Sequence, residues 1–302
     1  MPQLPEIRVG EPIRHEGLSV FPLFNEAGHG LDYLLSDEAI EAGDLTVAEV
    51  SEGGSVPTLT VENRADSRVL FLEGEELRGA KQNRVLNTSV LVPAHSKTTI
   101  PVSCVERGRW HYRTREFGSA GTHSSSKLRS VLKRSCTESV REGQGHTSDQ
   151  MAVWSEVGRQ ASSLGTRSDT GAMSDTYEAY RHRIEEFKAR LQYVEGATGF
   201  AVALGKQVVA VDFFDKPPTC RKVWDRLLTG LVIDALEAGQ TGQMAETDDV
   251  QALLGRVGKA QWQAAPAAGE GEEFRLEADP QTHASALWLS GTVVHGSVIV
   301  SG

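Results

Sequence analysis

The hydrophobic period changes twice along the chain, and this limits the folds that the chain can adopt. Apolar and polar residues alternate in short runs over the first third, follow a helical period in the middle, and alternate again near the end. Parallel βαβ winding needs strands and helices that alternate one by one, which this order does not provide. We therefore predict an α+β fold whose core is a mostly antiparallel β-sheet or sandwich.

The first third contains six strand-like runs and a short helical piece at 37–43. The runs are 18–24, 32–36, 58–63, 68–74, 85–92 and 97–105. Proline cannot donate a hydrogen bond to a ladder, so Pro93 and Pro101 place the last two runs at edges or bends. The Gly- and Ser-rich segment 117–126 is predicted to be a loop.

A helical insertion is predicted at about 123–191, where three apolar stripes follow one another. The segment 199–215 is typical of a β-hairpin, and a long helix follows at about 217–237, with Pro217 at its start. A short helix near 250–257 and three strands complete the chain. We expect one α+β domain over 1–302, divided into a β-rich part (1–116), a helical part (123–191) and a closing α/β part (197–302).

Charge and cysteine content exclude several classes of protein. The net charge of −10 over 302 residues disfavours binding to nucleic acid or to an anionic membrane. No run of about 18 apolar residues occurs, and the N-terminus does not resemble a secretory signal. Three widely spaced cysteines are typical of a reducing compartment. We expect a soluble, cytoplasmic protein. The basic segment 106–142 either attracts an anionic ligand or faces acidic segments within the fold.

Polar functional groups are densest in residues 73–110, where they form two clusters. The first cluster offers three carboxylates as general acid, general base or cation ligand: Glu73, Glu75 and Glu76. Substrate-binding candidates in the first cluster are Arg78, Lys81, Gln82, Asn83 and Arg84, and those in the second are Glu106, Arg109 and Trp110. Arginine suits phosphate or carboxylate, and tryptophan can stack on a ring. If 85–92 and 97–105 pair as a hairpin through 93–97, the clusters meet at one end of the sheet. The alternative is a set of solvated turns with internal ion pairs.

Other familiar motifs are absent or incomplete. Residues 74–82 nearly match a phosphate-binding P-loop, but Ala80 interrupts it, Gln82 replaces the hydroxyl residue, and a strand follows. The histidines show no metal-ligand spacing, so no metal site is predicted. No Ser-His-Asp order appears. Asp212, on an apolar run, is interpreted as a structural acid, and Cys104 as a core thiol, with a nucleophilic Cys104 kept as an alternative.

Residues 72–110, LEGEELRGAKQNRVLNTSVLVPAHSKTTIPVSCVERGRW, resemble the signature of a known family. It is the first domain family associated with ADP-ribosylglycohydrolase and rhodanese–phosphatase-superfamily proteins. The likeness extends from about residue 18 to the C-terminal strands and is weaker between 117 and 175. It implies a role near ADP-ribose or NAD metabolism, and it supplies neither a reaction nor catalytic residues.

Two hypotheses follow. The first is an enzyme or ligand-binding domain that acts on an anionic, nucleotide-like substrate through the clusters named above, with no particular cofactor implied. The second is a non-catalytic binding or scaffold module, in which the polar cluster is structural or docks a protein partner. An open cleft lined by Glu75, Lys81 and Arg84 would favour the first hypothesis, and internal pairing of the charges would favour the second.

Overall fold

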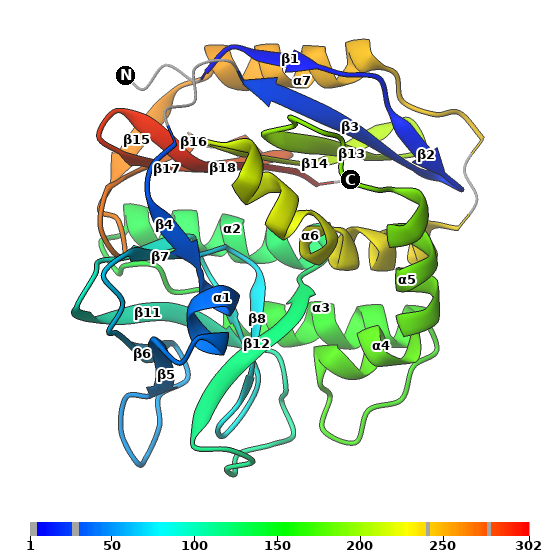
Figure 1. Ribbon diagram of the computed structural model, residues 1–302. Helices are drawn as coiled ribbons and strands as arrows, with labels where there is room; N and C mark the ends of the chain where they lie inside the picture. Colours follow the sequence, from blue (N-terminus) through cyan, green and yellow to red (C-terminus); the bar gives the residue numbers. More distant parts are fainter. Residues whose placement is uncertain (1–4, 26–29, 240–241, 277–278, 302) are drawn as a thin grey trace.

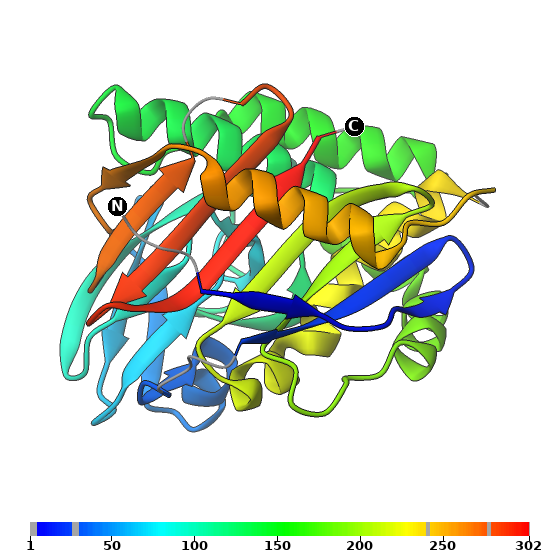
Figure 2. The same ribbon diagram turned by 90° about the horizontal axis from the view of Figure 1, so that it is seen from above.

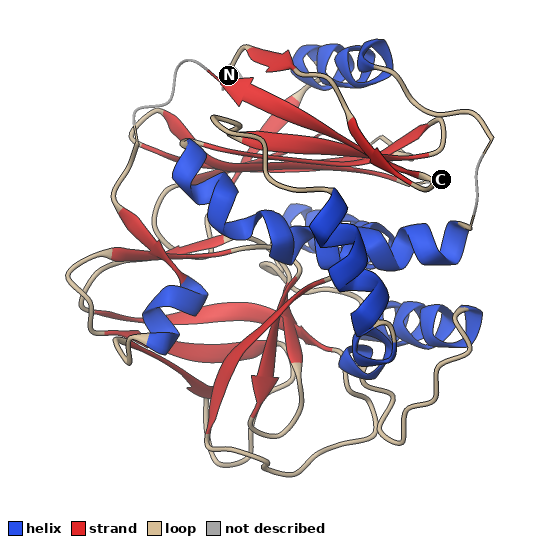
Figure 3. Cartoon of the chain, turned by 45° about the vertical axis from the view of Figure 1, so that its right-hand side comes forward, coloured by secondary structure: helices blue, strands red, loops and turns tan. Residues whose placement is uncertain are grey.

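A layer of helices separates two β-structures in the computed structural model, which describes residues 5–25, 30–239, 242–276 and 279–301 (Figures 1 and 3). One β-structure is a nine-stranded sheet, and the other combines a closed six-stranded barrel with a three-stranded sheet. Within the described residues, strand pairs are antiparallel except for the pairing of β4 with β7. The predicted α+β class with a mostly antiparallel core is therefore confirmed.

The nine-stranded sheet joins the two ends of the chain. Its order is β1-β3-β13-β14-β18-β17-β16-β15, and β2 pairs with β3. The strands are β1 (Ile7–Val9), β2 (Ile13–His15), β3 (Leu18–Asn25), β13 (Gly199–Leu204), β14 (Gln207–Phe214), β15 (Trp262–Ala265), β16 (Glu272–Leu276), β17 (Thr282–Leu289) and β18 (Thr292–Val300). Helix α7 (Thr247–Lys259) crosses the outer face of this sheet (Figure 2).

The barrel and the small sheet contain the segment with the densest polar residues. The barrel order is β11-β6-β5-β12-β8-β9, and the small sheet has the order β10-β7-β4. The barrel strands are β5 (Leu45–Glu49), β6 (Thr58–Asn63), β8 (Glu75–Gly79), β9 (Arg84–Leu86), β11 (Ser96–Cys104) and β12 (Glu116–His123). The small sheet contains β4 (Tyr33–Leu35), β7 (Arg68–Phe71) and β10 (Val90–Val92).

The helices between the β-structures bury apolar residues on both sides. The central helices are α2 (Ser126–Arg141) and α6 (Pro217–Ala238), with α3 (Gln150–Ser163), α4 (Met173–Ala179) and α5 (Arg181–Arg190) beside them. Helix α1 (Ser36–Glu41) packs instead on the barrel and the small sheet (Figure 1). Pro217 starts α6 without the loss of a helical hydrogen bond, and the Ser125 hydroxyl caps α2 by accepting from Leu128 N. The largest apolar cluster includes Leu132 of α2 and Trp224 of α6, which places the main core in this layer.

The elements agree with the sequence predictions over much of the chain, but strands β5, β8 and β15 were not predicted, and several predicted segments need correction. Residues 117–126 were expected to be a loop, but β12 occupies 116–123 and extends the β-rich part past residue 116. The polar composition of this strand reflects its place on a barrel whose other face is exposed. The run 85–92 is two strands, β9 and β10, which belong to different sheets. Buried hydrogen bonds hold the connecting Asn87, Thr88 and Ser89 and interrupt the ladder.

The hairpin expected through 93–97 does not form, because β10 and β11 do not pair with each other. β10 pairs with β7, whereas β11 pairs with β6 over 96–101 and with β9 over 102–104. Pro101 lies where β11 changes partner, as expected for a proline at a bend. The pairing of Cys104 with Arg84 nevertheless returns the second polar cluster to the first.

Helix α6 packs closely against the junction of β12 and α2. A Cβ at Gly230 would lie 2.2 Å from the carbonyl oxygen of Ser124 and 2.5 Å from that of His123. Beside it, the Thr229 hydroxyl accepts from His123 N at 2.9 Å. Only glycine allows this approach, which fixes where α2 begins.

We expect Gly230→Ala to lower the free energy of unfolding by about 1–3 kcal/mol, because the methyl group forces the two backbones apart. Gly158→Ala in α3 is the matched control, since a Cβ there meets no atom within 4 Å. This control should stabilise the helix by about 0.5–1 kcal/mol. Urea unfolding of both variants measures the difference, and equal effects would contradict the packing argument.

Candidate functional site

The three candidate carboxylates do not form one acidic site, because each points into a different network. Glu73 meets Lys133 and Arg129 of α2. Glu75 accepts from the Ser36 hydroxyl and from Leu72 N, and Glu76 accepts from the Thr122 hydroxyl at 2.6 Å. All three are buried. A run of acids in sequence is thus divided among α2, α1 and β12.

Burial affects these acids differently because their partners differ. Burial opposes the ionisation of Glu73. The charges of Lys133 and Arg129 outweigh this effect and hold the pKa of Glu73 below its ordinary value. Burial dominates for Glu75 and Glu76 and raises their pKa values, although Arg226 and Arg78 act in the opposite direction. Arg226 lies 3.6 Å from Glu75, and Arg78 lies 3.9 Å from Glu76 with its own side chain 41% exposed.

The two polar clusters meet around Asn83, as the sequence analysis expected. Glu106 Oε2 accepts from Asn83 N at 3.1 Å and from Arg109 Nη2 at 2.6 Å, and the Gln82 amide donates to Glu106 O. Burial opposes ionisation of Glu106, but the Arg109 hydrogen bond prevails and lowers its pKa. These four side chains are buried and form one hydrogen-bonded group.

Arg109 holds the loop at 79–83 in a strained conformation. Its guanidinium donates to Ala80 O at 2.6 Å and to Gly79 O at 3.3 Å, while Ala80 N donates to the Thr114 hydroxyl. Ala80 has φ 37°, a left-handed conformation that is uncommon for a residue with a Cβ. Backbone strain that surrounding hydrogen bonds maintain is concentrated at functional sites. The loop at 79–83 is therefore a candidate part of a binding site.

Lys81, Arg84, Trp110 and Glu49 form a group that we call the Trp110 face. Lys81 Nζ lies 5.2 Å and Arg84 Cζ 5.7 Å from the Trp110 ring, and Trp110 is 47% exposed. Glu49 is 3.8 Å from Arg84 Nη2. Both Glu49 oxygens and Arg84 Nε and Nη2 are buried without a hydrogen-bond partner among the described residues. Such unmet capacity is costly, and a bound ligand or water can satisfy it.

A buried ion-pair network connects the helix layer to both β-structures, and we call it the α2 clamp. Arg129 binds both oxygens of Asp212 at 2.6 and 2.8 Å, and Lys133, one turn later, binds Glu73 and the Ser285 hydroxyl. The two cations balance the two carboxylates. Asp212 is thus a structural acid, and Arg129 outweighs burial to hold its pKa far below the ordinary range.

Ser89, His295 and Asp212 form a buried chain that sequence spacing did not reveal. Ser89 Oγ lies 2.7 Å from His295 Nδ1, and His295 Nε2 lies 3.1 Å from Asp212 Oδ1. The order resembles a hydrolytic triad, but Ser89 also accepts from Glu73 N, and all three residues are buried. Asp212 is already bound by Arg129. These contacts make the hydrogen-bonded series Ser89, His295 and Asp212 part of the α2 clamp.

Three cavities, of about 600, 380 and 460 Å³, are lined by residues other than the predicted site residues. Among the described residues, the side chains of His15, Glu16 and Glu186 lie close enough together to hold a metal ion. Arg183 donates to Glu16 in that group and supplies its positive charge.

Sequence reasoning missed the residues that complete these networks. Glu49 ends β5, a strand that the sequence analysis did not predict, and Arg129 and Lys133 lie on α2, where only a helix was predicted. Their partners are far away in sequence, so no local motif joins them. The one signal in the sequence was the spacing of Arg129 and Lys133, which are four residues apart on the apolar face of a helix. This spacing places both charges toward the core.

We expect Lys133→Met to lower the free energy of unfolding by about 3–5 kcal/mol, because Glu73 then loses its closest cation in a buried site. Lys127→Met in the same helix is the control. Its ion pair with Glu237 is partly exposed, so a cost below about 1 kcal/mol is expected. Chemical denaturation at pH 7 compares them, and similar losses would show that the clamp does not stabilise the fold.

Cys104 is a fully buried thiol, and burial raises its pKa despite the nearby Arg84. A buried thiol with little thiolate reacts slowly. We expect a colorimetric disulfide reagent to modify no cysteine rapidly in the native protein and all three after denaturation. Fast native labelling that Cys104→Ser abolishes would instead support the nucleophile alternative.

The comparisons with known proteins agree with the resemblance seen in the sequence. The family model of the ARG and Rhodanese-Phosphatase-superfamily-associated Protein domain matches residues 6–299. No curated protein and no solved structure gives a significant match. Across the described residues, no helix has the length and apolar character needed to cross a membrane. Because the match covers nearly the whole chain, the protein belongs to the first family of ARG and rhodanese-phosphatase-superfamily-associated domains.

Proposed function

We propose that the protein is a binding domain for an anionic, nucleotide-like small molecule, and that the Trp110 face is its site. The observation that carries this proposal is the pair Glu49 and Arg84, whose buried polar atoms lack hydrogen-bond partners beneath an exposed tryptophan. Arg78 Nε and Arg109 Nε also lack hydrogen-bond partners among the described residues, but at Glu49 and Arg84 a carboxylate and a guanidinium lack them side by side. A ligand at this position supplies the missing partners.

Each group of the Trp110 face matches one part of a nucleotide. The exposed Trp110 ring offers a surface on which a base stacks. Lys81 and Arg84 are cations that suit phosphate oxygens. Two Arg84 nitrogens, Nε and Nη2, have no hydrogen-bond partner among the described residues. Glu49 accepts hydrogen bonds and suits ribose hydroxyls, as carboxylates do in dinucleotide sites. In this proposal Glu49, and not Glu73, Glu75 or Glu76, is the carboxylate that contacts the ligand.

The loop at 50–57 covers this group. Lys81 Nζ donates to the carbonyl oxygens of Glu52 and Gly53. A Cβ at Gly54 would lie 3.3 Å from Glu49, Lys81 and Trp110 alike, so this glycine sits directly over all three. Binding then requires the exposed loop to exchange its two carbonyl contacts with Lys81 for contacts between Lys81 and the ligand.

The family supports the choice of ligand and the cell compartment. Its description names association with ARG proteins, which we interpret as ADP-ribosylglycohydrolases, so ADP-ribose and NAD are the first ligands to test. Three free, buried cysteines support a reducing compartment, and we propose the cytoplasm.

We expect ADP-ribose to raise the melting temperature of the wild-type protein, because a ligand that binds only the folded state stabilises it by mass action. Trp110→Ala should weaken binding about tenfold or more, since stacking contributes roughly 1–3 kcal/mol per base. Thermal unfolding with and without ADP-ribose measures the first effect. Isothermal titration with ADP-ribose, NAD and AMP measures the second and detects turnover as a changing heat baseline.

Met151→Ala is the matched control, because it truncates another exposed apolar side chain, on α3 and 57% exposed. It should leave binding unchanged. Lys81→Met tests the phosphate contact independently of stacking. The proposal fails if none of the three nucleotides binds, or if Trp110→Ala and Lys81→Met bind as tightly as the wild type.

A non-catalytic scaffold is the second candidate, and one observation favours it. Of the predicted site residues, all but Arg78 and Trp110 are buried, and most of them bind one another or the backbone. In that case Trp110→Ala alters no small-molecule binding, and the polar cluster contributes to stability alone.

A further inference from the structure

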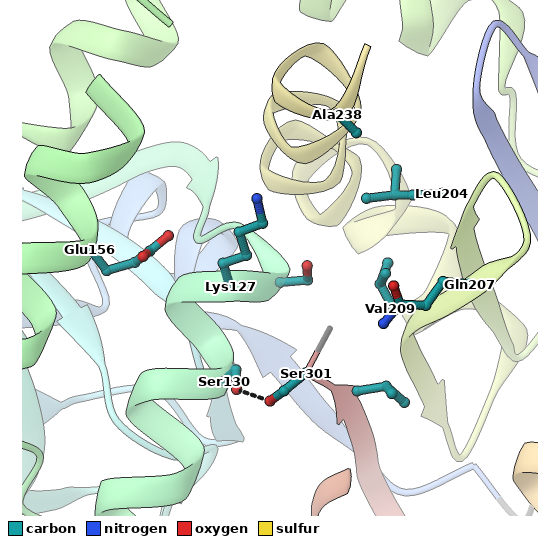
Figure 4. A pocket seen from close by; sticks show the side chains of 10 residues that line it. Lys127, Ser130, Glu156, Leu204, Gln207, Val209, Ala238 and Ser301 are labelled. Atoms are coloured by element: carbon teal, nitrogen blue, oxygen red, sulfur yellow. Dashed lines mark hydrogen bonds between the residues drawn. The ribbon is translucent and has the colours of Figure 1, made fainter. Parts of the chain in front are cut away.

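A cavity of about 600 Å³ lies between the helix layer and the nine-stranded sheet, away from the Trp110 face. We call it the serine pocket, because Ser126 and Ser130 of α2 and Ser301 after β18 line it (Figure 4). The other lining residues are Lys127, Glu156, Leu204, Gln207, Val209, Ala238 and Val300. The elements that meet here are α2, α3, α6, the β13–β14 hairpin and the end of β18.

One side of the serine pocket is apolar and the other carries hydrogen-bonding groups. Leu204, Val209 and Val300 supply the apolar side. The Ser130 and Ser301 hydroxyls bond each other at 2.6 Å, which leaves one O–H and the spare lone pairs for a ligand. The Gln207 amide has no hydrogen-bond partner among the described residues and lies beside Val209 in Figure 4. The polar side of the serine pocket therefore offers both hydrogen-bond donors and hydrogen-bond acceptors.

The charges near the serine pocket cancel. Lys127 Nζ donates to Glu237 at 3.0 Å, and Arg159 binds both Glu237 and Glu156. Two cations therefore face two carboxylates in a closed network. An added anion would meet Glu156 and Glu237, and an added cation would meet Lys127 and Arg159, so the pocket favours neither.

A buried carboxylate behind the wall orients one of the serines. Asp234 accepts from Ser126 N at 2.6 Å. Asp234 is fully buried, and its Oδ1 lacks a hydrogen-bond partner among the described residues. This bond fixes the backbone of Ser126, whose hydroxyl can donate and accept hydrogen bonds in the pocket.

We propose that the serine pocket binds a neutral, hydroxyl-bearing small molecule of the sugar or nucleoside class. A hydroxyl group both donates and accepts, so it matches the mixed set formed by Ser126, Gln207 and the Ser130–Ser301 pair. The carbon face of such a molecule packs on Leu204, Val209 and Val300. This site is separate from the one proposed for nucleotides, and each can be tested without the other.

Saturation-transfer NMR on the full chain, followed by titration, tests the proposal with ribose, glucose and adenosine. Ribose 5-phosphate and gluconate are the charged counterparts. At least one neutral compound should bind, and more tightly than its charged counterpart where the panel has one. Gln207→Ala should weaken binding by up to about tenfold, as expected for one lost neutral hydrogen bond, and Ser130→Leu should abolish it by filling the cavity.

The controls separate this site from others. Gln251→Ala changes an exposed glutamine on α7 and should have no effect. Trp110→Ala should leave the binding of ribose and glucose intact, which distinguishes the serine pocket from the Trp110 face because these sugars have no base to stack. The proposal is overturned if no neutral compound binds at millimolar concentration, or if binding persists unchanged in both Gln207→Ala and Ser130→Leu.

Discussion

The fold depends on two cations, Arg129 and Lys133, that α2 carries into the space between the β-structures. Arg129 binds Asp212 of the nine-stranded sheet, and Lys133 binds Glu73 of the barrel side. Removing four charges from water is costly, and only complete pairing with good geometry offsets that cost. The pairing therefore fixes the position of the helix relative to both β-structures. The Ser89–His295 contact extends the same network into the loop between β9 and β10.

Satisfied and unsatisfied polar groups separate structural from functional roles in this protein. Glu73, Glu106, Arg109 and Asp212 all have close partners of opposite charge, and their chemistry is directed inward. The Trp110 face differs, since both Glu49 oxygens and Arg84 Nε and Nη2 are buried without hydrogen-bond partners among the described residues, beside a strained, well-anchored loop. The family assignment associates the chain with ARG and rhodanese-phosphatase-superfamily proteins.

Most of the elements could be predicted because their signals are local. The long helix α6, the hairpin of β13 and β14 and strand β6 lie where periodicity and turn residues placed them. Strand β12 could not be predicted, since its Gly- and Ser-rich sequence is typical of a loop and becomes a strand only through pairing with β5 and β8. The division of 85–92 was equally hidden, because it depends on buried contacts with Arg275 and His295.

The sequence alone determined the α+β class, the family and the segment in which polar groups are concentrated. The clusters at 73–84 and 106–110 meet through the pairing of β9 with β11 and not through the hairpin that the sequence predicted. Only the tertiary structure decided which charges are paired. Glu73 and Lys133 are 60 residues apart, and Asp212 and Arg129 are 83 apart. Ion pairs over such separations leave no periodic pattern in a chain, because the fold itself brings their members together.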